Sequence, residues 1–170
     1  NPTRSGFLEV VRDMGADIEY LNQQQSGGEP AADILVKSSQ LHSTDIRGKI
    51  IPRLIDEIPI IAVLAAGAEG KTIIRDAREL RVKETDRIQA LASQLPALGV
   101  NIKPFEDGLI IKGPTAITGG CKLRSFGDHR IAMSLSIAGL TAGGPVQITG
   151  EESIRTSYPG FMDTLQQLSI

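Results

Sequence analysis

Apolar residues recur along this chain with two spacings, one typical of helices and the other typical of strands. From Phe7 to Met14 they follow one helix face, and Gly15 comes next, where a left-handed glycine commonly ends a helix. Residues 16–22 and 33–39 instead alternate polar and apolar side chains, and a polar stretch containing Ser-Gly-Gly separates them. The pattern therefore predicts a helix followed by a β-hairpin.

The middle of the chain contains an apolar, alanine-rich segment, residues 58–69. Such a segment predicts a helix that is buried on nearly all sides. Gly70 ends it, and residues 71–77 predict a strand. Thr85 is then a candidate N-cap for an amphipathic helix over 88–98, where apolar side chains recur at helical spacing.

The order of these elements recurs in the second half of the chain. The segments GVNIKPF and GLIIKGP repeat the hairpin, DHRIAMSLSIAGLTAGG repeats the buried helix, and PVQITG repeats the strand after it. Placing Gly70 on Gly144 gives an offset of 74 positions, which also places Arg81 on Arg155. We predict two copies of one unit; chance similarity between alternating helices and strands is the alternative. The predicted divisions are residues 1–77 and 78–150, with a C-terminal helix over 158–169.

Charge and cysteine content narrow the functional classes. Lys and Arg number 18 against 20 Asp and Glu, so no overall positive field is available to bind nucleic acid or an anionic membrane. The longest apolar stretch is about half of the ~20 residues that a membrane-spanning helix needs. The single cysteine, Cys121, fits a reducing, cytoplasmic location, and together with His42 and His129 it lacks the spacing of a zinc site. The chain has no initiator Met, so we expect a piece of a longer protein.

Three charged clusters each precede a predicted helix: Asp56–Glu57, residues 83–87 (KETDR) and residues 128–130 (DHR). Helix N-termini expose unpaired N–H groups and partial positive charge, and Arg and Lys add donors for phosphate or carboxylate. If the repeated units pack side by side, these helix starts converge on one anion-binding edge. The alternative is structural: a solvated first turn for KETDR, and a helix cap for Asp128.

Two longer segments, IPRLIDEIPIIAVLAAGAEGKTIIRDARELRVKETDRI and SFGDHRIAMSLSIAGL, together resemble the 5-enolpyruvylshikimate-3-phosphate (EPSP) synthase family of enolpyruvyl transferases. The similarity extends from NPTRSGFLEVVRDMGADIEY to TSYPGFMDTLQQL, which is essentially the whole chain. It covers only the later part of a much longer family sequence. The resemblance therefore implies a C-terminal fragment that lacks the other part of the enzyme.

The resemblance also implies a fold. Members of the family form two similar lobes, each built from three repeats of a βαβαββ unit whose buried helices are directed inward, as in an inside-out α/β barrel. This chain would then have a mixed α+β or α/β fold and supply about two units of one lobe. The helix N-termini of both lobes point into the cleft where the substrates bind.

The family's reaction transfers the enolpyruvyl group of phosphoenolpyruvate to the 5-hydroxyl of shikimate 3-phosphate and releases phosphate. It is a step of the shikimate pathway of aromatic amino acid biosynthesis, it uses no metal and no organic cofactor, and glyphosate inhibits it. The chemistry needs a base for the hydroxyl, an acid for the methylene carbon, and cations for two phosphates and a carboxylate. The implied partners are both substrates and the missing N-terminal part of the same enzyme, with no nucleic acid and no membrane.

The resemblance carries specific roles onto LIDEIP, RVKETDR and DHR. Asp56 matches an acid that contacts the sugar hydroxyls and is the candidate base. Glu84 matches the carboxylate proposed to move a proton at the methylene, and Lys83 beside it contacts substrate and is a candidate to share the proton transfers. Arg87 and Arg130 match arginines that bind phosphoenolpyruvate.

One position departs from the family pattern. Where the family has an active-site lysine before its TSYP-like stretch, this chain has Arg155. Arginine stays protonated, so Arg155 is expected to bind substrate and not to transfer a proton.

Two other functions match parts of the pattern. UDP-N-acetylglucosamine enolpyruvyl transferases share the fold and the donor, but Cys121 does not match their reactive cysteine, and RVKETDR favours the EPSP synthase family. A noncatalytic anion- or nucleic-acid-binding module is disfavoured by the acidic charge balance and by an aromatic content of 4% without Trp. We also expect this chain alone to be inactive, because the other lobe should complete both substrate sites.

Overall fold

The structure, a computed structural model, describes residues 1–168. Its α-helices are α1 (Gly6–Asp13), α2 (Ile58–Gly67), α3 (Arg87–Gln94), α4 (His129–Leu140) and α5 (Phe161–Leu168). Its strands are β1 (Asp17–Ser26), β2 (Glu29–Lys37), β3 (Asp45–Ile46), β4 (Gly70–Ile74), β5 (Asn101–Phe105), β6 (Gly108–Gly113), β7 (Cys121–Arg124) and β8 (Val146–Thr149). Short 3₁₀ helices are η1 (Gly48–Arg53), η2 (Ile55–Glu57), η3 (Arg78–Val82), η4 (Leu95–Leu98) and η5 (Glu151–Thr156). None of the helices in this part of the chain is long and apolar enough to cross a membrane.

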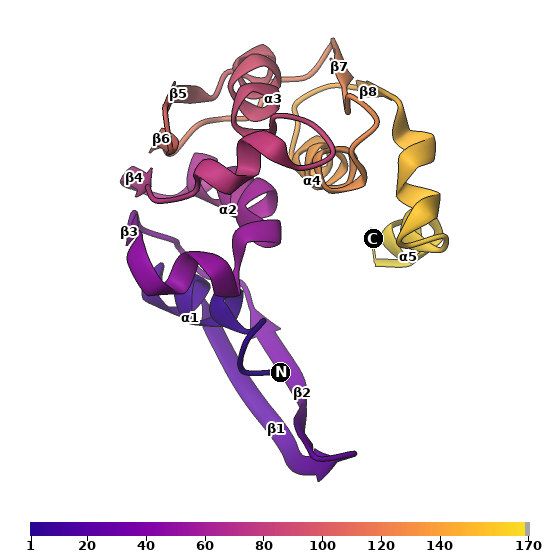
Figure 1. Cartoon of the computed structure of the whole chain (residues 1–170). Coiled ribbons are helices and arrows are strands. Elements are labelled where there is room, and N and C mark those ends of the chain that lie inside the picture. The colour runs from indigo at the N-terminus through magenta and orange to yellow at the C-terminus, as the bar shows by residue number, and fades with distance from the viewer. Residues whose placement is uncertain (169–170) are drawn as a thin grey trace.

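In residues 1–168 the strands form three sheets. β1 and β2 pair antiparallel and form an arm that extends away from the rest of the chain (Figure 1). The four-stranded sheet has the order β3-β4-β6-β5, in which β3 and β4 are parallel and the other two pairs are antiparallel. β7 and β8 form a parallel pair. Both predicted hairpins, β1–β2 and β5–β6, are therefore confirmed.

The connections between the strands follow a recurring order. The series α1-β1-β2-β3-α2-β4 is followed by α3-β5-β6-β7-α4-β8, and in both series the last strand runs parallel to the short strand before the buried helix. β4, the last strand of the first series, also pairs antiparallel with β6 in the hairpin of the second series. Within the described residues β8 pairs only with β7, and β2 only with β1. Both strands of the β1–β2 pair and both strands of the β7–β8 pair therefore have an unpaired edge among these residues.

The core is centred on α2 and α4, which pack against each other. α2 is apolar along its length, and both Ile58 and Ile61 are fully buried. α4 contributes Ile131 and Leu135 to the same core cluster. The predicted burial is confirmed for most of α2, whose apolar side chains allow packing on several sides, and α4 buries five of its twelve residues. The N-terminal ends of α2 and α4 carry two of the three charged clusters, and this packing brings them close together.

Two predicted helix starts differ from the structure, and the helix predicted over 88–98 ends at Gln94, where the 3₁₀ helix η4 follows. Thr85 as the N-cap of α3 is wrong: Asp86 caps the helix, because its carboxylate accepts a hydrogen bond from the Gln89 N–H at 2.9 Å. The helix expected over 158–169 corresponds to α5, which begins at Phe161 after a Pro-Gly pair. Position 169 lies outside the described residues.

Candidate active site

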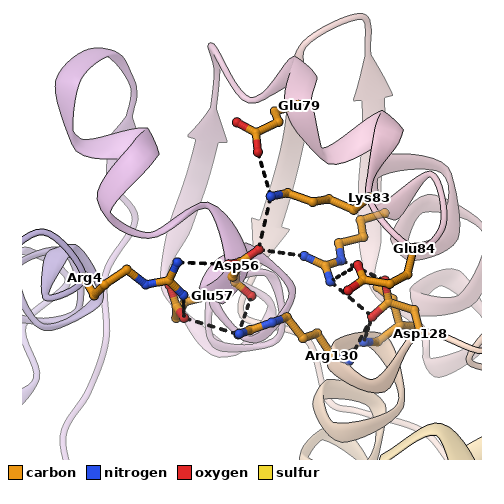
Figure 2. A network of polar contacts seen from close by, with 10 residues as sticks. Arg4, Asp56, Glu57, Glu79, Lys83, Glu84, Asp128 and Arg130 are labelled. Atoms are coloured by element: carbon orange, nitrogen blue, oxygen red, sulfur yellow. Dashed lines mark hydrogen bonds and ion pairs between the residues drawn. The ribbon is translucent and has the colours of Figure 1, made fainter. Parts of the chain in front are cut away.

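Arg87 is the centre of a polar network formed by three segments that are far apart in the sequence. Its side chain is fully buried (0% exposed), although it is the first residue of α3. Its Nε donates to Asp128 Oδ2 at 2.8 Å, its Nη1 to Asp56 Oδ1 at 3.0 Å, and its Nη2 to Glu84 Oε2 at 2.6 Å. Asp56 and Asp128 lie at the starts of α2 and α4, so the structure brings the three charged clusters together (Figure 2).

Asp128 is both a helix cap and a counter-ion. Its Oδ1 accepts hydrogen bonds from the backbone N–H groups of Arg130 at 2.8 Å and Ile131 at 3.2 Å, which confirms the cap. Its Oδ2 neutralises Arg87, and both side chains are fully buried. Because an unpaired charge is costly to bury, this ion pair ties the start of α3 to the start of α4.

Lys83 lies between two carboxylates, directly after η3. Its Nζ is 2.6 Å from Glu79 Oε1 and 3.5 Å from Asp56 Oδ1. The hydrogen bond with Glu79 raises the pKa of Lys83 above its ordinary value, burial opposes the increase, and the charge of Asp56 adds to it. In this state Lys83 is a cation that can contact an anionic ligand, and it is a poor group for proton transfer at neutral pH.

Asp56 is the junction of the network. Its Oδ2 accepts a hydrogen bond from Arg4 Nη1 at 3.1 Å, and its Oδ1 contacts both Lys83 and Arg87. Burial raises the pKa of Asp56, but the surrounding cations outweigh burial and hold the pKa below its ordinary value. The charge of Arg130 is the largest of these opposing effects, followed by the hydrogen bond from Arg4. Asp56 is therefore ionised at neutral pH and is a weak proton acceptor unless its cationic partners turn toward a substrate.

The lowered pKa of Asp56 means that ionised Asp56 stabilises the fold at neutral pH and that this stabilisation is lost in acid. A carboxylate with a lower pKa in the folded than in the unfolded chain stabilises the fold above the unfolded-state pKa, about 3.9 for Asp. This contribution is lost as the pH falls through the folded-state pKa. We therefore expect the difference in unfolding free energy between the chain and its Asp56→Asn variant to be larger at pH 7 than at pH 3. Urea unfolding of both proteins at the two pH values checks this, and a pH-independent difference would contradict it.

Three members of the network, Arg4, Glu57 and Glu79, received no role from the sequence. Arg4 Nη2 lies 3.5 Å from Glu57 Oε1, and Arg130 Nη1 lies 3.2 Å from the same oxygen. Arg130 Nη1 also donates to the backbone carbonyl of Asp56 at 3.2 Å. Local spacing gives no signal for Arg4, because it precedes α1 and meets the start of α2 only through tertiary packing.

The network carries more negative than positive charge. Its carboxylates are Asp56, Glu57, Glu79, Glu84 and Asp128, and its cations are Arg4, Lys83, Arg87 and Arg130. At neutral pH these nine side chains have a net charge of −1. An anionic ligand with several negative charges therefore needs further cations from outside this network.

The surroundings of the network leave room for a small ligand group. A cavity of about 180 Å³ borders it and is lined by residues of α2, α4 and α5 together with Asp56 and Glu57. Arg155 lies outside the network: it is exposed in η5, and its side chain forms no hydrogen bond or ion pair with any residue from 1 to 168. In the same range no group of His, Cys, Asp or Glu is placed to hold a metal ion.

Comparison with known proteins gives one consistent family. The family model described as EPSP synthase (3-phosphoshikimate 1-carboxyvinyltransferase) matches residues 1–165. The 3-phosphoshikimate 1-carboxyvinyltransferase of Syntrophotalea carbinolica is 55% identical over 96% of this chain and 38% of its own length. That of Geobacter sulfurreducens is 51% identical over 100% of this chain and 39% of its own length. The chain thus spans about two fifths of the length of these relatives.

Solved structures agree with the sequence comparison. An EPSP synthase from Acinetobacter baumannii superimposes with a TM-score of 0.95 at 43% identity, over 99% of this chain and 40% of that protein. The enolpyruvyl transferase NikO from Streptomyces tendae superimposes with a TM-score of 0.77 at 23% identity, over 97% of this chain and 35% of that protein. The second similarity shows a shared fold, and the expected enolpyruvyl transferase fold is confirmed.

Proposed function

Because this chain belongs to the EPSP synthase family, we propose that it is the C-terminal segment of a 3-phosphoshikimate 1-carboxyvinyltransferase. The complete enzyme would transfer the enolpyruvyl group of phosphoenolpyruvate to shikimate 3-phosphate in the shikimate pathway, in the cytoplasm, and glyphosate would inhibit it. The main support for this proposal is that Asp56, Glu84 and Arg130 come together around the buried Arg87. These residues would form one side of the substrate site.

The proton transfers are assigned to the two carboxylates. In the addition step the 5-hydroxyl oxygen bonds to the central carbon of phosphoenolpyruvate, its proton passes to Asp56, and Glu84 donates a proton to the methylene carbon. In the elimination step Glu84 takes a proton back from the new methyl group, the C–O bond to phosphate breaks, and the leaving phosphate takes the proton held by Asp56, which returns both carboxyl groups to their starting states. Glu84 suits this role because its side chain is half exposed and hydrogen-bonded only to Arg87 among the described residues. Lys83 would contact substrate as a cation.

The two arginines of the site differ in how many donors they have free. Among residues 1–168 the Arg130 side chain uses only Nη1, which leaves its Nε and Nη2 available for a carboxylate or a phosphate. Arg87 is buried and engaged by three carboxylates. It would contact phosphoenolpyruvate after Glu84, its most exposed partner, moves toward the methylene carbon. Arg155 would join as a binding residue when the rest of the enzyme closes over the site.

Exposed apolar side chains on the β1–β2 arm support the proposal that this chain is part of a larger protein. In the β5–β6 hairpin, Leu109 and Ile111 are fully buried, because α2 and α3 pack against β6. In the β1–β2 arm, by contrast, Ile34 and Val36 are exposed. We infer that the missing N-terminal part of the enzyme covers this arm, because exposed apolar strand edges are otherwise prone to aggregation. We also infer that this chain supplies two approximate repeats of one lobe, residues 1–77 and 78–150.

The isolated chain should not catalyse the reaction. Its network has a net charge of −1, while the two substrates bring two phosphates and a carboxylate. Incubation of the purified chain with both substrates should therefore release no phosphate above a protein-free blank, whereas the full-length enzyme should turn over under the same conditions. Robust turnover by the isolated chain would show that no second lobe is needed.

No observation favours the other two functions. The similarity to NikO concerns the fold, and the relatives with high identity carry the name 3-phosphoshikimate 1-carboxyvinyltransferase. Neither a UDP-N-acetylglucosamine enolpyruvyl transferase nor a noncatalytic anion-binding or nucleic-acid-binding module gains support from these comparisons.

A further inference from the structure

Glu57 lies directly before helix α2, where a side chain often caps the helix, but its side chain does not cap α2. It is the N-cap residue of α2, and its side chain accepts no hydrogen bond from the first turn of that helix. Its Oε1 instead lies 3.2 Å from Arg130 Nη1 and 3.5 Å from Arg4 Nη2. The carboxylate is therefore directed away from its own helix and toward two guanidinium groups from other segments (Figure 2).

The second carboxylate oxygen of Glu57 has an unusual environment. Oε2 is buried and has no hydrogen-bond partner among residues 1–168. A buried acceptor without a partner in the fold is unfavourable, so the Glu57 side chain is not optimised for stability alone. A cost of this kind at a polar site indicates a constraint from function.

The contact with Glu57 determines which edge of Arg130 is free. Arg130 Nη1 is held by Glu57 Oε1 and by the backbone carbonyl of Asp56, both at 3.2 Å. Nε and Nη2 make no hydrogen bond with the described residues, and this edge of a guanidinium can bind a carboxylate or phosphate with two parallel hydrogen bonds.

Without Glu57, Arg130 has a competing partner within reach. Arg130 Nη1 already lies 3.2 Å from the backbone carbonyl of Asp56, and the charge of Arg130 helps to lower the pKa of the Asp56 carboxyl group. If Glu57 were absent, the guanidinium would be free to turn toward Asp56. That turn would occupy the donors that a ligand needs.

We propose that Glu57 is a positioning residue, which holds one corner of Arg130 so that its Nε–Nη2 edge stays available to the anionic group of phosphoenolpyruvate. This inference rests on the proposed function. Glu57 itself does not touch the substrate, because its Oε1 is shared by two arginines and a carboxylate would repel an anion. Its effect on the reaction passes through Arg130.

The test uses steady-state kinetics of the full-length enzyme. Glu57→Ala should raise the KM for phosphoenolpyruvate about 10- to 100-fold, with a much smaller change in kcat, because a misplaced binding group weakens capture of the substrate. Glu57→Gln keeps an acceptor for Arg130 Nη1 and should restore most of the loss. Glu9→Ala is the matched control. Glu9 also pairs with an arginine, Arg53, but it lies outside the network, so the KM of this variant for phosphoenolpyruvate should stay unchanged.

A double-mutant cycle separates positioning from a general structural effect. In an Arg130→Ala background, Glu57→Ala should cause no further rise in KM. An equal rise in both backgrounds, or an equal loss with Glu57→Gln and Glu57→Ala, would overturn the proposal. Thermal unfolding of each variant identifies any that fail to fold. If Glu57→Ala fails to fold, the KM of Glu57→Gln decides whether the proposal holds.

A measurement that does not depend on enzyme activity distinguishes the positioning role of Glu57 from the proposed function. In ¹⁵N-arginine-labelled full-length protein, Glu57→Ala should speed rotation of the Arg130 guanidinium, with the signal assigned through Arg130→Lys. Unchanged rotation would overturn the positioning role even if the enzyme is active. Absence of phosphate release by the unsubstituted full-length protein would instead refute the proposed function, and the rotation measurement would still decide the role of Glu57.

Discussion

Replacing Glu84 by Gln in the full-length enzyme should lower kcat by about 10²- to 10⁴-fold, the range that general acid–base groups contribute. Glutamine keeps the size of the side chain and an acceptor for Arg87 Nη2, which now lies 2.6 Å from the carboxylate. It cannot give a proton to the methylene carbon or take one back. The KM values of both substrates should therefore change much less than kcat, as steady-state kinetics with each substrate varied in turn would show.

Glu79→Gln is a suitable control for this substitution. Glu79 is another carboxylate of the network, it pairs with Lys83 at 2.6 Å, and its side chain is 62% exposed. We expect less than about a 10-fold change in kcat, because no proton transfer is assigned to Glu79. If Glu84→Gln weakened substrate binding as much as it lowered kcat, the proton-transfer role of Glu84 would be wrong.

The second large effect concerns stability. Asp128→Ala should lower the unfolding free energy of the chain by about 3–5 kcal/mol, because it leaves the fully buried guanidinium of Arg87 without its buried counter-ion. The same substitution removes the cap of α4, which adds to the loss. Urea denaturation followed by circular dichroism measures the difference.

An exposed ion pair provides the matched comparison. Glu19 accepts a hydrogen bond from Lys37 at 2.8 Å on the β1–β2 arm, and both side chains are about half exposed. Glu19→Ala should cost at most about 1 kcal/mol, since solvent screens such pairs. Similar losses for Asp128→Ala and Glu19→Ala would mean that the buried pair does not hold the starts of α3 and α4 together.

Local sequence patterns predicted the elements that depend on local preferences. The alternation in residues 16–22 and 33–39 led to β1 and β2, and the apolar segment 58–69 led to the buried helix α2. The wrong choice of Thr85 as the N-cap of α3 also concerns a local preference. Asp86 is an equally good N-cap, and the hydrogen bond to Gln89 N–H shows which of the two neighbours the helix uses.

The arrangement of the site was less accessible from the sequence. Residue types alone predicted a solvated helix turn for KETDR at least as well as an active site, and only its match to the EPSP synthase family favoured the second interpretation. Burial of Arg87 depends on Asp128, which is 41 residues away, and the contact of Arg4 with Asp56 spans 52 residues. No local period encodes contacts of that range, because they arise when the starts of packed helices meet.

We propose that Asp56, Glu84 and Arg130 line one side of a pocket for the two anionic substrates. Crystals of the full-length Glu84→Gln enzyme with phosphoenolpyruvate and shikimate 3-phosphate would test it most directly, because slow chemistry should keep both substrates intact. We predict an anionic group of phosphoenolpyruvate within about 2.7–3.2 Å of the Arg130 guanidinium, with the methylene carbon facing residue 84. Substrates bound elsewhere, with the ion pairs of Figure 2 unchanged, would contradict the account.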